Sequence, residues 1–426
     1  MRVDDLPLPP IVLDAVPTIA HWPVRPVIAI EGGVAPAVWD DPLAIWDDPT
    51  GDLVWDGDPN ATGWTDATCT FTGMEIDTGE PDESGLFPAT RCLVQLDNSD
   101  GRWSSYTADG TASLFGPGRT LAVWAHNAEG DWWLFCGKVA RWDQRADETL
   151  EIEAFDNFSD LAQDIGTYTP GINGQKPAVR LAAILATAGE DAMPYDFAPG
   201  LVALTAQETD QAPLEEMQTV VLSDGGVLFV DADGKLLYFD RTWRAGRLDQ
   251  DAIPDISDNV CTAAFIVWEP VISTNDEGLA DRVILENVAE LRALAGASKG
   301  YTLALTGQQW TLQEEGDALA ALMLIDNSPR RLQVTEFDVY LLDPHQPEAW
   351  RAVDWRQLDK VRFVHDFAVP RGTTRVDVFV LLTSIMHAIT PEGWVMSCGT
   401  SKTVSYPTPI RYDTAQEYDT GKVYGF

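Results

Sequence analysis

The chain has 426 residues, of which 45% are hydrophobic, so it is long enough to form two or three domains with separate cores. Its 67 acidic and 28 basic residues give a formal net charge of −39. This excess disfavours stable binding to nucleic acid, which depends on Lys and Arg neutralising phosphates. The acids are spread along the chain among 16 Trp, 15 Phe and 10 Tyr, which indicates a folded, solvated surface.

The cysteines are far apart and form no CxxC pair, so they indicate neither a disulfide framework nor a zinc ribbon: Cys69, Cys92, Cys136, Cys261 and Cys398. The first residues combine acids and prolines where a secretory signal needs a basic start and an apolar core. No uncharged apolar run reaches the ~18 residues of a membrane span. We therefore expect synthesis in a reducing cytoplasm, without membrane insertion or signal-directed secretion.

Residues 1–62 form a predicted N-terminal arm that is rich in Pro and Trp and irregular. It contains three related phrases, Val38–Pro42, Ile45–Pro49 and Val54–Pro59, each built on Trp-Asp. They follow one another too closely for propeller blades, which need about 40 residues each. We interpret them as short extended pieces whose tryptophans either anchor the arm on a neighbouring subunit or cover the chain's own core.

Residues 63–165 are predicted to form a first tube-like β-domain. Turn clusters such as Asn98–Gly101 and Gly116–Gly118 separate the predicted strands, which is typical of a barrel or a sandwich. The predicted strands are Thr68–Thr72, Cys92–Leu96, Leu121–Ala125, Trp132–Cys136 and Leu150–Phe155.

Residues 166–254 are predicted to form a small α+β insert domain. Pro177–Gly189 begins with proline, repeats apolar residues at helical spacing and stops at glycine, which predicts a helix. Pro213–Ser223 predicts a second amphipathic helix. A hairpin follows, with strands Val227–Val230 and Leu236–Phe239 about the turn Asp231–Lys235.

Residues 255–404 are predicted to form a second β-domain with one helix, Asp317–Ile325. It closes with a hairpin, in which a strand ending at Thr390 turns at Pro391–Gly393 and returns from Trp394. The other predicted strands are Ala263–Trp268, Arg282–Glu286, Tyr301–Leu305, Leu332–Leu342 and Lys360–Phe367. Residues 405–426 are acidic and tyrosine-rich without clear periodicity, so we expect a C-terminal arm. The predicted fold class is thus mainly β with an α+β insert.

Three motifs have a structural explanation that outweighs the functional one. His387 lies in an apolar strand without an accompanying nucleophile motif, so we expect it to serve packing or subunit contact. Gly296–Gly300 fits GxSxG, but a nucleophile elbow needs a strand before the serine and a helix after it, whereas Val288–Ala295 has a helical or loop-like pattern. Asp231–Gly234 lacks the spaced acids of a calcium loop, and a hairpin turn with glycine at positive φ explains it.

We therefore predict no catalytic, cofactor-binding or metal-binding residues and no enzymatic activity. The five histidines, His21, His126, His345, His365 and His387, form no HxxxH or HxH spacing, and no phosphate-binding or dinucleotide-binding loop is present. Carboxylate pairs carry no weight in a chain with 67 acids. Two matches to the N-glycosylation pattern, at Asn60 and Asn157, are short enough to arise by chance.

The order of these segments resembles the tail hub proteins of long-tailed phages, often labelled minor tail proteins, especially those of phages that infect actinobacteria. The phrases that carry the resemblance lie between about residues 65 and 400: Cys92–Trp103, Gly116–Arg119, Phe135–Val139, Ile152–Leu161, Leu214–Arg241 and His387–Trp394. The Trp-Asp phrases and the last residues lie outside it.

The resemblance implies a homotrimeric ring of two tube-like β-domains per subunit, which joins the six-fold tail tube to a three-fold tip in the virion. The implied partners are further copies, tail-tube or distal-tail ring proteins and other tail-tip proteins, with DNA only as a transient passenger in an ejection channel. The acidic balance fits such a conduit. Two alternatives remain: a carbohydrate- or receptor-binding tip protein, with tryptophans exposed on one face, and a tail-associated cell-wall hydrolase.

Overall fold

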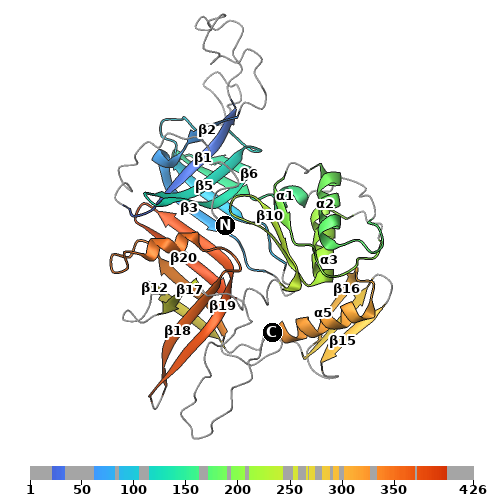
Figure 1. Ribbon diagram of the computed structural model, residues 1–426. Coiled ribbons are helices and arrows are strands. Elements are labelled where there is room, and N and C mark those ends of the chain that lie inside the picture. The colour runs from blue at the N-terminus through green and yellow to red at the C-terminus, as the bar shows by residue number, and fades with distance from the viewer. Residues whose placement is uncertain are drawn as a thin grey trace, which may run out of the picture. The chain divides into compact units, whose positions relative to one another are not determined.

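The computed structural model confirms a mainly β fold in which long antiparallel strands outnumber the helices (Figure 1). It describes residues 22–33, 62–81, 86–104, 115–162, 171–189, 193–206, 211–242, 253–257, 265–266, 268–273, 281–287, 291–296, 302–326, 333–369 and 372–400. The chain forms two compact units. The first comprises Met1–Ile76, Arg91–Asp156 and Ile389–Glu392, and the second comprises Asp77–Thr90, Asn157–Ala388 and Gly393–Phe426.

The first unit contains a sheet with the strand order β3-β4-β7-β6-β5-β1-β2. The strands are β1 (Arg25–Gly33), β2 (Thr62–Asp66), β3 (Phe71–Asp77), β4 (Arg91–Asp97), β5 (Thr120–Asn127), β6 (Gly130–Gln144) and β7 (Thr149–Phe155). From β4 to β2 each pair of neighbours is antiparallel. Cys92, Val94 and Leu96 are buried on one face of β4 because strand residues alternate between faces. The predicted strands from Cys92 to Phe155 are confirmed.

Two features of this sheet differ from the prediction. Thr68–Thr70 forms a 3-10 turn, and the strand predicted from Thr68 begins at Phe71. Strand β1 lies within the segment predicted to be irregular, and that interpretation is wrong for Arg25–Gly33. The apolar run from Val27 to Ile30 is completely buried, and β1 pairs with both β2 and β5. The Trp-Asp phrases lie outside the described residues.

The α+β part of the second unit has the predicted helices and hairpin. Its elements are α1 (Phe158–Leu161), α2 (Pro177–Ala188), α3 (Pro213–Asp224), β8 (Tyr195–Phe197), β9 (Val227–Val230) and β10 (Leu236–Phe239). Both long helices start at proline and end where a glycine adopts a left-handed conformation, as the sequence predicts. Figure 1 shows α2 and α3 side by side, and their buried residues share a core with β9 and β10.

A three-stranded sheet of strand order β15-β14-β16 packs against one helix of the second unit. Its elements are β14 (Arg282–Asn287), β15 (Arg292–Gly296), β16 (Thr302–Gln308) and α5 (Gln313–Asp326). Leu319, Ala320 and Met323 of α5 share a core with Val283 and Leu285 of β14. The helix begins four residues before the predicted Asp317. The helical or loop-like interpretation of Val288–Ala295 is wrong for residues 292–295, which lie in strand β15, and residues 288–290 lie outside the described residues.

The remaining strands of the second unit follow one another in the order β12-β11-β18-β19-β20-β17-β13. They are β11 (Ile253–Ser257), β12 (Phe265–Ile266), β13 (Trp268–Ser273), β17 (Gln333–Tyr340), β18 (Lys360–Val369), β19 (Gly372–Thr390) and β20 (Gly393–Thr400), with a 3-10 helix at Ala349–Asp354. The closing hairpin predicted from the sequence is confirmed as β19 and β20. The predicted C-terminal arm lies outside the described residues.

Candidate functional site

His387, the one histidine that invited a catalytic interpretation, is a packed residue of the closing hairpin. Its side chain is 5% exposed, and its Nδ1 accepts a hydrogen bond of 3.1 Å from Nε1 of Trp394. Burial lowers the pKa of His387 to about 3, so the ring is neutral at physiological pH. The expected packing role is confirmed, because a neutral imidazole whose Nδ1 accepts from a buried tryptophan fixes the two strands to each other.

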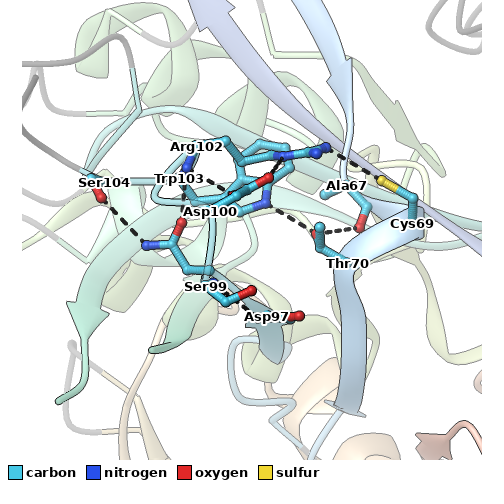
Figure 2. Close-up of polar contacts among 10 residues, drawn as sticks. Ala67, Cys69, Thr70, Asp97, Ser99, Asp100, Arg102, Trp103 and Ser104 are labelled. Carbon is cyan, nitrogen blue, oxygen red and sulfur yellow. Dashed lines mark hydrogen bonds and ion pairs between the residues drawn. The ribbon is translucent and has the colours of Figure 1, made fainter. Parts of the chain in front are cut away.

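The loop after β4 is held by side-chain hydrogen bonds, as Figure 2 shows. It is part of the phrase Cys92–Trp103 that the sequence analysis singled out. Asn98 accepts a hydrogen bond from the Trp103 amide at 2.9 Å, and Nε1 of Trp103 donates to Oγ1 of Thr70 at 3.0 Å. Trp142 Nε1 donates to the carbonyl of Trp103 at 3.0 Å. The buried Trp103 thus anchors the loop through its hydrogen bonds with Thr70 and Trp142.

The tip of this loop exposes an ion pair. Asp100 accepts from the backbone amide of Arg102 at 3.0 Å and from its Nε at 2.7 Å. These two donors hold the pKa of Asp100 below its usual range, and the same contact raises the pKa of Arg102. Arg102 also donates to the Cys69 thiol at 3.6 Å (Figure 2). The tip of the loop therefore presents polar side chains that are held by hydrogen bonds within the first unit.

A ladder of ion pairs crosses β3, β4, β7 and β6 on one face of the same sheet. Arg91 bonds Glu153 at 2.6 Å and lies 3.7 Å from Glu75. Arg141 contacts Glu151 at 2.9 Å and Glu153 at 3.4 Å, and Arg145 also contacts Glu151. The glutamates Glu151 and Glu153 are 9% and 16% exposed beneath arginines that are 39% to 55% exposed. This surface, called the arginine ladder below, is polar but internally neutralised.

The second unit contains a buried polar network that the sequence analysis missed. Arg180, completely buried on α2, donates to Gln309 Oε1 at 2.7 Å, to the carbonyl of Thr205 at 2.8 Å and to that of Ile172 at 3.1 Å. The close approach of the 171–175 loop requires glycine at 171, because a Cβ there would collide with the guanidinium. Arg180 is the one charged residue in the helix PAVRLAAILATA, and that isolation was the available signal.

Gln309 extends the network to α3. Its Nε2 donates to Glu216 at 3.1 Å, and its backbone amide donates to Ser223 Oγ at 2.7 Å. At the end of α3, Asp224 accepts from the amides of Leu201 and Val202 and from the hydroxyl of Tyr238. Together with the bond between Arg180 and Gln309, these contacts join segments that are up to 129 residues apart in sequence.

Two of the short motifs, the turn at Asp231–Gly234 and Asn157, have a structural explanation in the described residues. Gly234 has a φ of +84°, a left-handed conformation that the hairpin turn at Asp231–Gly234 uses and that disfavours any residue with a Cβ. The side-chain nitrogen Nδ2 of Asn157 donates a hydrogen bond of 2.7 Å to the Gly234 carbonyl, so this side chain stabilises the same turn. Gly296 ends β15, and the rest of the GxSxG phrase lies outside the described residues. Asn60 also lies outside them.

Within the described residues, no three His, Cys, Asp or Glu side chains gather as metal ligands. No helix in that part of the chain is long and apolar enough to span a membrane. Cys69, Cys92 and Cys398 are free thiols, and Cys261 lies outside the described residues.

Two solved tail proteins have a fold similar to that of this chain. A tail protein from Neisseria meningitidis superposes with a TM-score of 0.56 at 11% identity, covering 80% of this chain and 94% of that protein. The 43 kDa tail protein of prophage MuSo2 from Shewanella oneidensis gives a TM-score of 0.53 at 11% identity, covering 88% and 98%. No family model matches the sequence, and no curated protein matches it either. The chain therefore shares the fold of these tail proteins over nearly their whole length.

Proposed function

We propose that this chain is a structural virion protein, a tail hub that forms a ring at the tail tip. The observation that carries the proposal is the fold, shared with 94% and 98% of two solved tail proteins. The sequence phrases that resemble tail hubs are a second source of support. Most of them lie in regular elements of the fold, namely strands β4, β6 and β7, α3 with β9 and β10, and the closing hairpin. The proposed location is the virion tail tip, after synthesis in the host cytoplasm.

The proposed assembly is a homotrimer in which each subunit supplies two tube-like β-domains. The proposed division is an arm at 1–62, β-domains at 63–165 and 255–404 around an α+β insert at 166–254, and a second arm at 405–426. Six similar domains would meet the six-fold tail tube, while the opposite side offers three-fold symmetry to other tail-tip proteins. Ring closure requires heterologous contacts that close after three copies, with sheet edges covered by neighbours or arms.

The proposed ring also forms part of the DNA ejection channel. A net charge of −39 supports a conduit that repels the polyanion passing through it. The arginines of the ladder fit this role, because each is neutralised by a carboxylate. An assembled ring whose channel is lined mainly by unpaired Lys and Arg would contradict the conduit.

The carbohydrate- or receptor-binding alternative is weakened by the positions of the tryptophans. In the described residues no tryptophan side chain is among the exposed large hydrophobics, and eight are buried: Trp103, Trp124, Trp133, Trp142, Trp310, Trp350, Trp355 and Trp394. Sugar-binding surfaces stack exposed aromatic rings on saccharides. The burial of these rings supports a structural role.

The cell-wall hydrolase alternative makes a separate biochemical prediction. We propose that the chain is not an enzyme and needs no cofactor. Purified protein incubated with peptidoglycan should release no soluble fragments, with lysozyme as the positive control. Measurable turnover that survives repurification would contradict the structural assignment.

The hub proposal is tested by symmetry. Native mass measurement of the purified full chain should give three copies, and particle averaging of tails should place a three-fold ring at the tip. Assembled tails that contain six copies or a single copy in the ring would contradict the proposal.

A further inference from the structure

Three short segments meet where the helical pair α2 and α3 joins the sheet of β14, β15 and β16. The segments are 171–176, 201–206 and 308–312, and we call their meeting point the junction. Its backbone hydrogen bonds run from Leu204 N to Gln175 O at 2.9 Å, from Thr205 N to Gln309 O at 2.7 Å and from Thr311 N to Ala203 O at 3.1 Å. The junction thus connects the insert helices to the segment that leads into α5.

One glutamine side chain bridges two ionisable groups at the junction. The Gln309 amide oxygen accepts from Arg180 at 2.7 Å, and its nitrogen donates to Glu216 Oε1 at 3.1 Å. All three side chains are buried, with exposed fractions of 0%, 0% and 1% for Arg180, Gln309 and Glu216. The bridge therefore ties the 308–312 segment to both helices.

The second carboxyl oxygen of Glu216, Oε2, is buried without a hydrogen-bond partner. An ionised carboxylate in this position would leave one charged oxygen without a donor, which is costly in a buried site. Thr205 Oγ1 and Gln308 Oε1, also from junction segments, are likewise buried without partners. A proton on Oε2 would turn one of these unpaired acceptors into a donor.

The charged groups on the surrounding elements do not compensate an ionised Glu216 directly. Arg180, from α2, is already bonded by neutral oxygens of Gln175, Thr205, Gln309 and Ile172. Asp224, on α3 itself, is occupied by the Leu201 and Val202 amides and by Tyr238 of β10. Two further acids lie on neighbouring elements, Asp160 of α1 and Glu315 of α5, and Glu315 accepts from the Ala203 amide at 3.2 Å.

We propose that the junction is a proton-coupled latch. With a proton on Glu216, the Gln309 bridge holds the 308–312 segment against α2 and α3. Ionisation of Glu216 places a poorly solvated charge at the bridge and loosens this contact. The latch is a property of the second unit and is independent of the proposed tail-hub function.

The direction of the pKa shift agrees with this geometry. Burial raises the pKa of Glu216, while the Gln309 hydrogen bond and the charge of Arg180 oppose the rise. Since the pKa in the folded state lies above that in the unfolded chain, the stability that Glu216 provides is present below the unfolded pKa. It is lost as the pH rises through the folded pKa.

Glu216→Gln tests the latch in the full-length chain, because the amide has the shape of the protonated acid and carries no charge. Hydrogen exchange followed by mass spectrometry reports opening at the amides of Thr205, Gln309 and Thr311. At about pH 8 the variant should exchange several-fold more slowly than wild type in peptides that cover these amides, and below the ordinary glutamate pKa of 4.5 the two should match. Glu215→Gln is the matched control, since Glu215 is the exposed neighbour on the same helix.

Three results would overturn the latch: equal exchange in wild type and Glu216→Gln at both pH values, faster exchange in the variant at both, or the same slowing in Glu215→Gln. Wild-type protein alone gives a second test if the variant does not fold. After correction for intrinsic exchange rates, protection of Thr205 and Thr311 should be lower at about pH 8 than it is below the ordinary glutamate pKa of 4.5. Protection that stays constant, or falls equally at Val123 in the β5–β6 pair of the first unit, would also reject it.

Discussion

The arginine ladder of the first unit and Arg180 of the second unit show two different ways of accommodating an arginine side chain. In the arginine ladder, Arg91, Arg141 and Arg145 are 39%, 48% and 55% exposed and pair with carboxylates. In the second unit, Arg180 is completely buried and is held by carbonyl and amide oxygens. Exposed pairs gain little because water screens them, whereas a buried guanidinium depends on each acceptor around it. The arginine ladder therefore contributes little to stability and forms a polar surface, whereas Arg180 joins α2 to the segments around Thr205 and Gln309.

The largest expected effect is at Arg180. Arg180→Met should destabilise the second unit by about 3–5 kcal/mol, because Gln309 and the carbonyls around it lose their donors in a buried site. Denaturant unfolding followed by hydrogen exchange at the α2 and α3 amides would measure this loss. If Arg180→Met unfolds with the wild-type midpoint, the buried network does not stabilise the junction.

A comparably large effect is expected at His387 in acid. Its pKa is about 3 in the folded protein, against an ordinary value of 6.5 for an exposed histidine, so the unfolded state binds the proton first. Stability present above about pH 6.5 is lost as the pH falls, by about 3 kcal/mol at about pH 4. His387→Gln keeps an acceptor for Trp394 and should show a flatter decline of melting temperature over that range. An identical decline in both proteins would show that His387 does not carry the acid sensitivity.

A smaller effect is expected in the loop shown in Figure 2. Asn98→Ala removes the acceptor of the buried Trp103 amide and should destabilise the first unit by about 1–3 kcal/mol. Thermal unfolding would measure the loss, and Ser99→Ala, at the exposed neighbour, provides the control. Equal losses in the two variants would mean that the loop is not anchored through Asn98.

The smallest effect is expected in the ladder itself. Arg141→Met should change the free energy of unfolding by less than about 1 kcal/mol, because Arg141 is half exposed and screened by water. Raising the salt concentration should shrink even this difference. A loss as large as that of Arg180→Met would remove the distinction between the two kinds of arginine site.

Local signals predicted much of the secondary structure. Pro177 and Gly189 mark the ends of α2, and the turn from Pro391 to Gly393 marks the closing hairpin, because these residues restrict the backbone where they stand. Strand β1 was missed because its apolar run from Val27 to Ile30 is short and lies among prolines. Its pairing with β5, almost 100 residues later, is what makes it a strand.

Local sequence patterns are enough to predict the mainly β class, the helix boundaries at proline and glycine, and the packed character of His387, since each follows from nearby residues. The folded structure is needed to see that Arg180, Gln309 and Glu216 form one network and that Oε2 of Glu216 lacks a hydrogen-bond partner. Their separations of 129 and 93 residues leave no periodic signal in the sequence. A hydrogen bond between distant segments exists only once folding has brought them together, so its partners cannot be found from local patterns.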